Sequence, residues 1–156
     1  MLFVMKADLE PDLLLDEQLC FALYAASRRL TAVYRPLLEA LELTYPQYLV
    51  MLVLWERDGI TVRELGDRLQ LDSGTLTPLL KRLEQADLLS RRRRESDERE
   101  VEITLTKTGR SLHERAAEVP RCLAKKLCMS ADEFIRLRDE LKSLAAQLAA
   151  PTNERD

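Results

Sequence analysis

The sequence predicts a mainly α-helical fold with one small β-hairpin, and three observations carry this prediction. Apolar residues recur at helical spacing over most of the 156 residues, which contain only 4 Gly and 6 Pro. Residues 88–105 instead alternate apolar and polar side chains around a polar turn, as a hairpin does. Two short helices are predicted directly before the hairpin, and a hairpin in this position is typical of a wing.

A long helix is expected first, from Asp16 to about Leu41, with Pro36 kinking it. Its apolar face is formed by Leu19, Leu23, Ala26, Leu30, Val33, Leu37 and Leu41. The next helix has a start signal, because Thr44 and Gln47 have the spacing of a capping box. We expect this second helix to belong to the core and to support the segment that follows.

The two short helices have their own start signals. Thr61 and Glu64 form another capping box, and Asp72 or Ser73 can cap the second helix after a three-residue turn. Pro78 lies inside the second helix and removes one backbone hydrogen bond, so either the helix bends there or regular bonding begins late. We expect a short first turn before Pro78.

The outward face of this second helix carries short hydroxyls near its start and cations further on. Such a face suits a helix that enters the major groove of DNA by its N-terminal end. Its members are Ser73, Thr75, Thr77, Lys81 and Arg82.

The hairpin is expected to pair Leu88–Arg94 with Arg99–Leu105 across the turn Glu95–Glu98. Its first arm holds four consecutive arginines, which alone fit a solvated charged face equally well. After a recognition-type helix, however, they indicate a DNA-binding wing, so residues 61–105 are predicted to form a winged helix-turn-helix. Within the wing, Arg94 is expected on DNA, and Asp97 is expected to hold an arginine, with Arg99 reaching the minor groove or a phosphate.

After the wing, a helix is expected from Thr106 to about Val119, interrupted by Pro120. A last helix is expected over residues 131–149, with a start signal at Ser130–Glu133. The last helix has an apolar face formed by Phe134, Leu137, Leu141, Leu144 and Leu148. One small winged unit cannot cover all these faces. We therefore expect helices 16–41 and 131–149 to pack against a second copy, giving a homodimer that binds a palindromic double-stranded DNA operator.

Composition fits one domain spanning residues 1–156 with a formal net charge of −3. Charge is segregated, because residues 63–94 hold eight Lys and Arg against five acids, whereas residues 1–20 hold one against five. No apolar run is long enough for a membrane span, which predicts a cytoplasmic protein without membrane contact. Three cysteines without metal-ligand spacing predict neither a disulfide framework nor a metal site, and no cofactor motif is expected.

Four stretches resemble the MarR-type regulators and, within them, the organic hydroperoxide resistance (OhrR-like) regulators. They are Asp16–Tyr24 (DEQLCFALY), Leu43–Tyr48 (LTYPQY), Leu71–Glu84 (LDSGTLTPLLKRLE) and Asp97–Arg99 (DER). The resemblance runs through nearly the whole chain except its ends. It implies a transcriptional repressor that reacts with an organic hydroperoxide and then leaves its operator.

Cys20 has two interpretations. Between Leu19 and Phe21 it can be a buried small hydrophobe, whereas the resemblance implies a peroxidatic cysteine held by two tyrosines, here Tyr34 and Tyr45. Fourteen residues of helix span about 21 Å, so Tyr34 would have to come from the other subunit.

The resemblance also implies a resolving cysteine near Lys125 in two-cysteine members. Here Cys122 and Cys128 bracket that position, so either of them, or a small thiol, can react with oxidised Cys20. Two other functions stay open. One is a MarR-type regulator that responds to a small apolar or aromatic ligand, with Cys20 structural. The other is a thiol peroxidase, which we do not expect, because no general-base constellation supports catalytic turnover.

Overall fold

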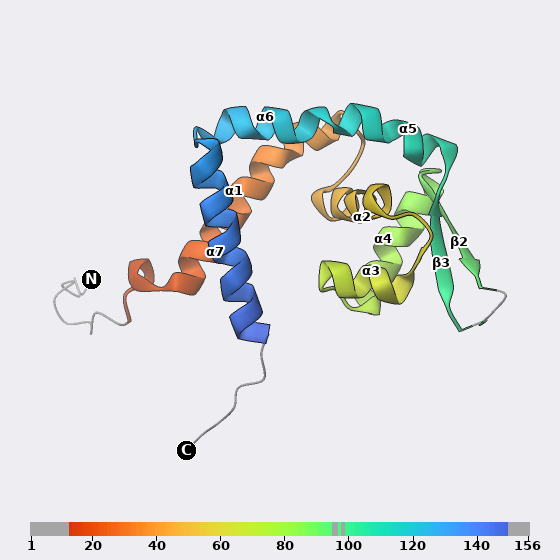
Figure 1. Cartoon of the computed structure of the whole chain (residues 1–156), viewed down its shortest axis with the longest axis horizontal. Helices are drawn as coiled ribbons and strands as arrows, with labels where there is room; N and C mark the ends of the chain where they lie inside the picture. Colours follow the sequence, from red (N-terminus) through yellow and green to blue (C-terminus); the bar gives the residue numbers. More distant parts are fainter. Residues whose placement is uncertain (1–12, 95–96, 98, 150–156) are drawn as a thin grey trace, which may run out of the picture. The chain divides into compact units, whose positions relative to one another are not determined.

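The computed structural model describes residues 13–94, 97 and 99–149, and these are mostly helical (Figure 1). The described residues form two compact units that divide after Pro120. The first unit holds the 3-10 turn η2 (Leu15–Glu17), α1 (Leu19–Glu39), α2 (Tyr45–Glu56), β1 (Ile60–Thr61), α3 (Val62–Leu69), α4 (Ser73–Gln85), β2 (Leu89–Arg93), β3 (Val101–Leu105) and α5 (Lys107–Ala116). Helix α6 (Glu118–Leu127) runs across the division, and α7 (Ala131–Ala149) lies in the second unit. None of the described helices is both long and apolar enough to cross a membrane.

Helix α1 begins later than the sequence predicted. Residues 15–17 form a 3-10 turn and Gln18 is extended (φ −82°, ψ 116°), so regular α-helical bonding begins at Leu19 rather than Asp16. Cys20 is therefore the second residue of α1 and not one full turn inside it. The helix continues through Pro36 to Glu39.

Two capping boxes confirm the predicted starts of α2 and α3. At α2, the side chain of Thr44 accepts from the backbone N–H of Gln47, whose side chain accepts from the N–H of Thr44 at 2.8 Å. At α3, the N–H of Thr61 donates to Glu64 at 2.7 Å and the hydroxyl of Thr61 accepts from the N–H of Glu64 at 3.1 Å. These reciprocal bonds satisfy backbone donors that a helix otherwise leaves unpaired.

The core of the first unit lies where α2, α3 and α4 pack beside the small sheet (Figure 1). Its fully buried side chains are Leu38, Val50, Met51, Leu54, Ile60, Leu65, Leu76, Leu80, Leu83, Leu89 and Ile103. At one edge, the indole of Trp55 donates to the carbonyl of Gly109 at 2.9 Å and joins α2 to α5. This core holds α4 and the hairpin in one body.

The sheet has three strands in the order β1-β3-β2, so the prediction of an isolated hairpin was incomplete. Strand β1 pairs Ile60 with Ile103, while β2 and β3 are antiparallel, with Leu89 opposite Leu105. The carboxylate of Asp58 secures the end of β3, because its Oδ1 accepts from the N–H of Leu105 at 2.8 Å. The turn residues Glu95, Ser96 and Glu98 lie outside the described part.

The break after the wing also differs from the prediction. Thr106 caps α5 as expected, but the helix ends at Ala116, and Pro120 lies in the first turn of α6. A proline is tolerated there because the first helical N–H groups have no intrahelical acceptor. In the second unit, Ser130 and Glu133 form the predicted start signal of α7, with the Ser130 N–H donating to Glu133 at 2.8 Å.

Candidate nucleic-acid interface and thiol site

The turn between α3 and α4 is tight. Gln70 adopts a left-handed conformation (φ 54°), and the N–H of Leu71 donates to the carbonyl of Gly66 at 3.0 Å. A Cβ on Gly66 would lie 2.9 Å from the carbonyl oxygen of Leu71, so only glycine fits this approach. The turn therefore fixes the angle at which α4 leaves α3.

Helix α4 is capped by Asp72 and is continuous across Pro78, with five residues before the proline. The carboxylate of Asp72 accepts from the backbone N–H of Thr75 at 2.9 Å and from its hydroxyl at 3.0 Å. Hydrogen bonding by Thr75 holds the pKa of Asp72 below its usual value, the backbone bond contributing most. The cap thus stays negatively charged at neutral pH.

The predicted DNA-reading side chains of α4 are all exposed, whereas Leu76, Leu80 and Leu83 of the same helix are buried. The exposed set is Ser73, Thr75, Thr77, Lys81 and Arg82. Two of its hydroxyls already donate within the helix, Thr75 to Asp72 and Thr77 to the carbonyl of Ser73 at 2.7 Å. Toward an external group, these hydroxyls can act as acceptors.

The four arginines of the wing do not play one role. Arg91 is held by Glu84 of α4, with its Nη2 at 2.6 Å from the Glu84 carboxylate, and hydrogen bonding from Arg91 lowers the pKa of Glu84. Arg94 is paired with Glu100 at 3.0 Å and Glu102 at 3.2 Å.

Arg92 and Arg93 differ from these two. Both are exposed, and neither has an ion pair within the described part of the chain. The uncompensated positive charge of β2 is therefore carried by Arg92 and Arg93.

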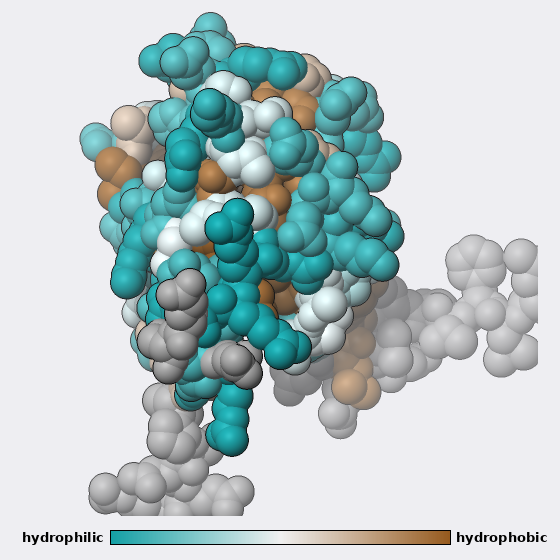
Figure 2. Space-filling model, turned by 90° about the vertical axis from the view of Figure 1, so that its right-hand side faces the viewer, coloured by the Kyte–Doolittle hydropathy of each residue, from teal (hydrophilic) through white to brown (hydrophobic). Residues whose placement is uncertain are grey.

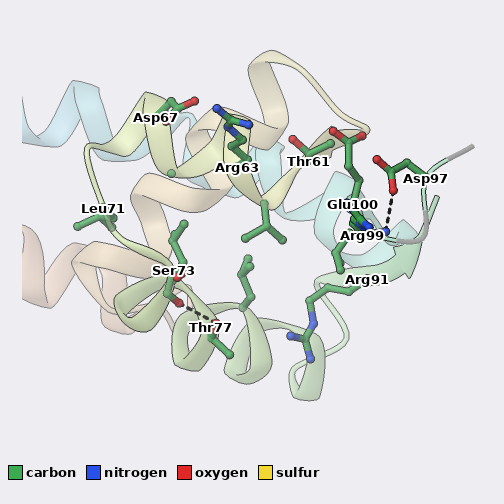
Figure 3. A pocket seen from close by; sticks show the side chains of 15 residues that line it. Thr61, Arg63, Asp67, Leu71, Ser73, Thr77, Arg91, Asp97, Arg99 and Glu100 are labelled. Carbon is green, nitrogen blue, oxygen red and sulfur yellow. Dashed lines mark hydrogen bonds between the residues drawn. The ribbon is translucent and has the colours of Figure 1, made fainter.

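Asp97 lies beside Arg99, but the contact is not the predicted carboxylate–guanidinium pair. Oδ1 of Asp97 accepts from the backbone N–H of Arg99 at 3.0 Å, which shapes the turn and leaves the guanidinium exposed (Figure 3). Sequence reasoning expected a side-chain pair because both groups are charged. A backbone donor two residues away is nearer and needs no side-chain ordering.

A hollow of about 670 Å³ lies between α3, α4 and the hairpin. Figure 3 shows Arg63 of α3, Thr77 of α4 and Arg91 of β2 around it. The side of the molecule that carries the hairpin is predominantly hydrophilic (Figure 2). Ser73 and Thr77 of the α4 face thus share one concave surface with Arg91 and Arg99 of the hairpin.

The structure brings Tyr34 and Tyr45 together and adds Tyr48, which sequence reasoning missed. The rings of Tyr34 and Tyr45 have centroids 4.9 Å apart, and those of Tyr34 and Tyr48 are 6.0 Å apart. Burial, with smaller contributions from Tyr45 and Tyr48, raises the pKa of Tyr34 to about 12. These phenols therefore stay protonated at neutral pH and can donate hydrogen bonds. The i, i+3 spacing of Tyr45 and Tyr48 was the available sequence signal.

Cys20 is exposed in the single chain and lies at the far end of α1 from Tyr34. Cys122 is half-buried in α6, whereas Cys128 is exposed just after that helix with a left-handed backbone (φ 50°). All three described cysteines are free thiols. Among the described residues, no group of His, Cys, Asp and Glu is arranged to hold a metal ion.

The fold and this surface define a winged-helix protein of the DNA-binding regulator class. Residues 32–116 match the family model described as transcriptional regulator SarA/Rot. The chain is 48% identical over 134 residues to the organic hydroperoxide resistance transcriptional regulator of Bacillus subtilis, covering 86% of this chain and 91% of the relative. It is 52% identical over 136 residues to the HTH-type transcriptional regulator TtmR of Methylorubrum extorquens, covering 87% of this chain and 70% of TtmR.

Solved structures agree with these sequence relatives. AbfR of Staphylococcus epidermidis superposes with a TM-score of 0.74 at 39% identity, covering 88% of this chain and 95% of AbfR. A structure described as reduced AbfR bound to DNA gives a TM-score of 0.71 at 40% identity, covering 86% and 93%. A structure described as disulfide-formed AbfR gives a TM-score of 0.61 at 40% identity, covering 84% of this chain and 92% of AbfR. The chain therefore belongs to the MarR family of winged-helix transcriptional regulators.

Proposed function

We propose that this regulator is a homodimeric repressor that binds a palindromic operator and releases it when an organic hydroperoxide oxidises Cys20. The observation that carries the proposal is the position of Cys20, exposed in the first turn of α1. The first N–H groups of an α-helix have no intrahelical acceptor and favour an anion, so this position suits a thiolate.

The reaction follows from thiol chemistry. The Cys20 thiolate attacks the outer peroxide oxygen, the O–O bond breaks, and the departing alkoxide takes up a proton to become an alcohol. The product is Cys20 sulfenic acid. A second thiol then attacks the oxidised sulfur, which forms a disulfide and releases the sulfenic oxygen as water.

The second thiol is proposed to be Cys128 or Cys122 of the partner subunit, or a small thiol. Cys128 is favoured because it is exposed in the segment between α6 and α7, whereas Cys122 is half-buried in α6. The disulfide-formed structure of AbfR supports a thiol switch of this kind in a relative. A bond across the dimer would displace the helices that position the two DNA-reading units.

Tyr34 and Tyr45 are proposed to hold the thiolate of the partner subunit. Their ring centroids lie 4.9 Å apart, and the raised pKa of each phenol keeps its hydroxyl protonated as a donor. Cys20 of the same chain cannot take that place, since fourteen helical residues separate it from Tyr34 by about 21 Å. The proposed sensor site therefore combines residues of two subunits.

For operator binding, we propose that Ser73, Thr75, Thr77, Lys81 and Arg82 of α4 enter the major groove. The wing would follow the adjacent backbone through Arg94 and Arg99, with Asp97 shaping the turn that presents Arg99. Arg92 and Arg93, which have no ion pair within the described residues, would add further phosphate contacts. The DNA-bound structure of reduced AbfR supports this use of the fold.

Peptide mapping by mass spectrometry, after one equivalent of cumene hydroperoxide, tests the chemistry. The proposal predicts that Cys20 is modified first, and that a crosslinked peptide then contains Cys128 or Cys122. Exclusive modification of Cys122 or Cys128, with Cys20 unchanged, would contradict it.

A ligand-responsive regulator is the second candidate. An apolar cleft of about 310 Å³ lies between α2 and α5 and is lined by Tyr48, Leu52, Trp55, Glu56, His113, Ala116, Ala117 and Pro120. It has room for a small aromatic molecule. In that case cumene hydroperoxide would leave DNA binding unchanged even where Cys20 becomes oxidised.

A further inference from the structure

Helix α1 presents two arginines on one face, beside the tyrosine cluster. Arg28 and Arg35 are two helical turns apart, about 10 Å along the axis, and line a groove of about 540 Å³ with Thr44 and Tyr45. Glu39 is the one acid among the residues that line the groove. The groove is therefore a cationic surface in contact with a proposed sensor residue.

The two arginines are not equally engaged. Arg28 donates to the hydroxyl of Tyr24 at 2.8 Å, and its guanidinium carbon lies 5.4 Å from the centre of that ring. Arg35 is exposed and has no hydrogen bond or ion pair within the described residues. An arginine has five N–H donors in a planar fork suited to carboxylates, so Arg35 has free capacity for an acidic partner.

The segment before and around Cys20 has the complementary character. Asp16 and Glu17 are exposed there together with large apolar side chains, which are Leu13, Leu15, Leu19 and Phe21. This segment cannot reach the groove of its own chain, because sixteen helical residues place Leu19 about 24 Å from Arg35. A second copy can bring the two together.

We propose that the groove receives residues 13–21 of a second copy of this chain. The Asp16 and Glu17 carboxylates of one subunit would pair with Arg35 and the free donors of Arg28 in the other. This proposal rests on the cross-subunit sensor proposed above and explains how the thiol is seated. The acid–arginine contact fixes the first turn of α1, which places Cys20 beside Tyr45 and Tyr34.

The contact also has an electrostatic consequence. Asp16 and Glu17 lie within four residues of Cys20, and their charges repel a sulfur anion. Pairing both carboxylates with arginines of the partner offsets that repulsion only in the dimer. By two-fold symmetry every contact occurs twice, so one substitution removes two contacts.

Charge reversal tests the proposal. The reduced dimer is measured by sedimentation equilibrium for the parent, for R35E, for D16R/E17R and for the chain that combines all three changes. We expect R35E to dimerise about tenfold more weakly, since two ion pairs become repulsions, and D16R/E17R to dimerise more weakly still, since four do. The combined chain restores the Arg35 contacts with reversed sign, so we expect it to dimerise about tenfold more tightly than D16R/E17R. Arg29→Glu is the matched control, because Arg29 is exposed on α1 but does not line the groove.

Circular dichroism first checks that R35E is folded. If it is not, the neutral variants R35Q, D16N/E17Q and their combination form a double-mutant cycle that takes the place of the charge reversals. The proposal is overturned if Arg35 and Arg29 variants dimerise alike, or if the combined changes only add. Because the dimer is measured without peroxide, failure here leaves the Cys20 chemistry to be judged by peptide mapping.

Discussion

Glu84 of α4 holds Arg91 of β2 through both carboxylate oxygens. Oε2 accepts from the Arg91 side chain at 2.6 and 3.0 Å, and Oε1 accepts from the Arg91 backbone N–H at 3.1 Å. The pair joins the C-terminal turn of the helix proposed to read bases to the first strand of the wing. It therefore sets the distance between two elements that must contact one DNA duplex together.

Glu84→Gln should lower discrimination between operator and random DNA by about tenfold, because a neutral amide cannot hold Arg91 in the same charge-assisted geometry. Affinity for random duplex should not fall, since Arg91 becomes free to meet phosphates. Fluorescence anisotropy on duplexes selected from a random pool measures both quantities. Exposed Glu114→Gln on α5 is the control, and an equal loss for the two variants would exclude the positioning role.

Arg93→Ala should weaken binding to all duplexes and reduce the slope of log affinity against log salt by about one, as expected for one lost phosphate contact. Arg94→Ala should change the slope less, because Glu100 and Glu102 already compensate its charge. Binding titrations over a salt series distinguish the two. Equal slopes for both variants would show that pairing in the free protein does not decide which arginine meets DNA.

Thr75→Val and Arg99→Ala should affect binding differently. Valine removes a hydroxyl at the exposed start of α4, so preference should relax at particular base positions. Loss of Arg99 should weaken specific and random DNA to similar degrees, because phosphate contacts carry no sequence information. Binding to a panel of single-base operator variants measures the difference, and uniform loss in both cases would contradict this division of roles.

Tyr34→Phe should preserve stability in alkaline solution. The folded protein raises the pKa of Tyr34 from 10.0 to about 12, so its protonated form is favoured on folding. That contribution is complete below pH 10 and is lost as the pH rises from 10 to about 12. Between the two ends of this pH window, the free energy of unfolding measured in urea should fall less for Tyr34→Phe than for the parent. An identical loss would show that Tyr34 is not the group responsible.

The elements that the sequence predicted well are those set by local contacts. Capping boxes at Thr44, Thr61 and Ser130 bond residues three positions apart, so their spacing alone located three helix starts. The first helix was placed three residues early because an acidic 3-10 turn resembles a helix start. Strand β1 was missed because two residues have no periodicity, and its pairing with β3 is non-local.

At the candidate site too, features set by local contacts were predicted and features set by tertiary contacts were not. The exposed face of α4 follows from helical periodicity, so its members were predicted individually. Which wing arginines are neutralised depends on Glu84, Glu100 and Glu102, whose distances only the fold determines. The gathering of Tyr48 with Tyr34 is likewise a tertiary contact. The proposed meeting of Cys20 with these phenols requires a second chain, which a single sequence does not contain.

Oxidation of Cys20 is proposed to release this regulator from DNA. The most direct test is operator binding by the parent and by Cys20→Ser before and after one equivalent of cumene hydroperoxide, with Cys122→Ser and Cys128→Ser as matched thiol controls. We predict that Cys20→Ser binds DNA like the reduced parent and stays bound after peroxide, while the parent dissociates. If Cys20→Ser left DNA under peroxide as readily as the parent, Cys20 would not be the sensor.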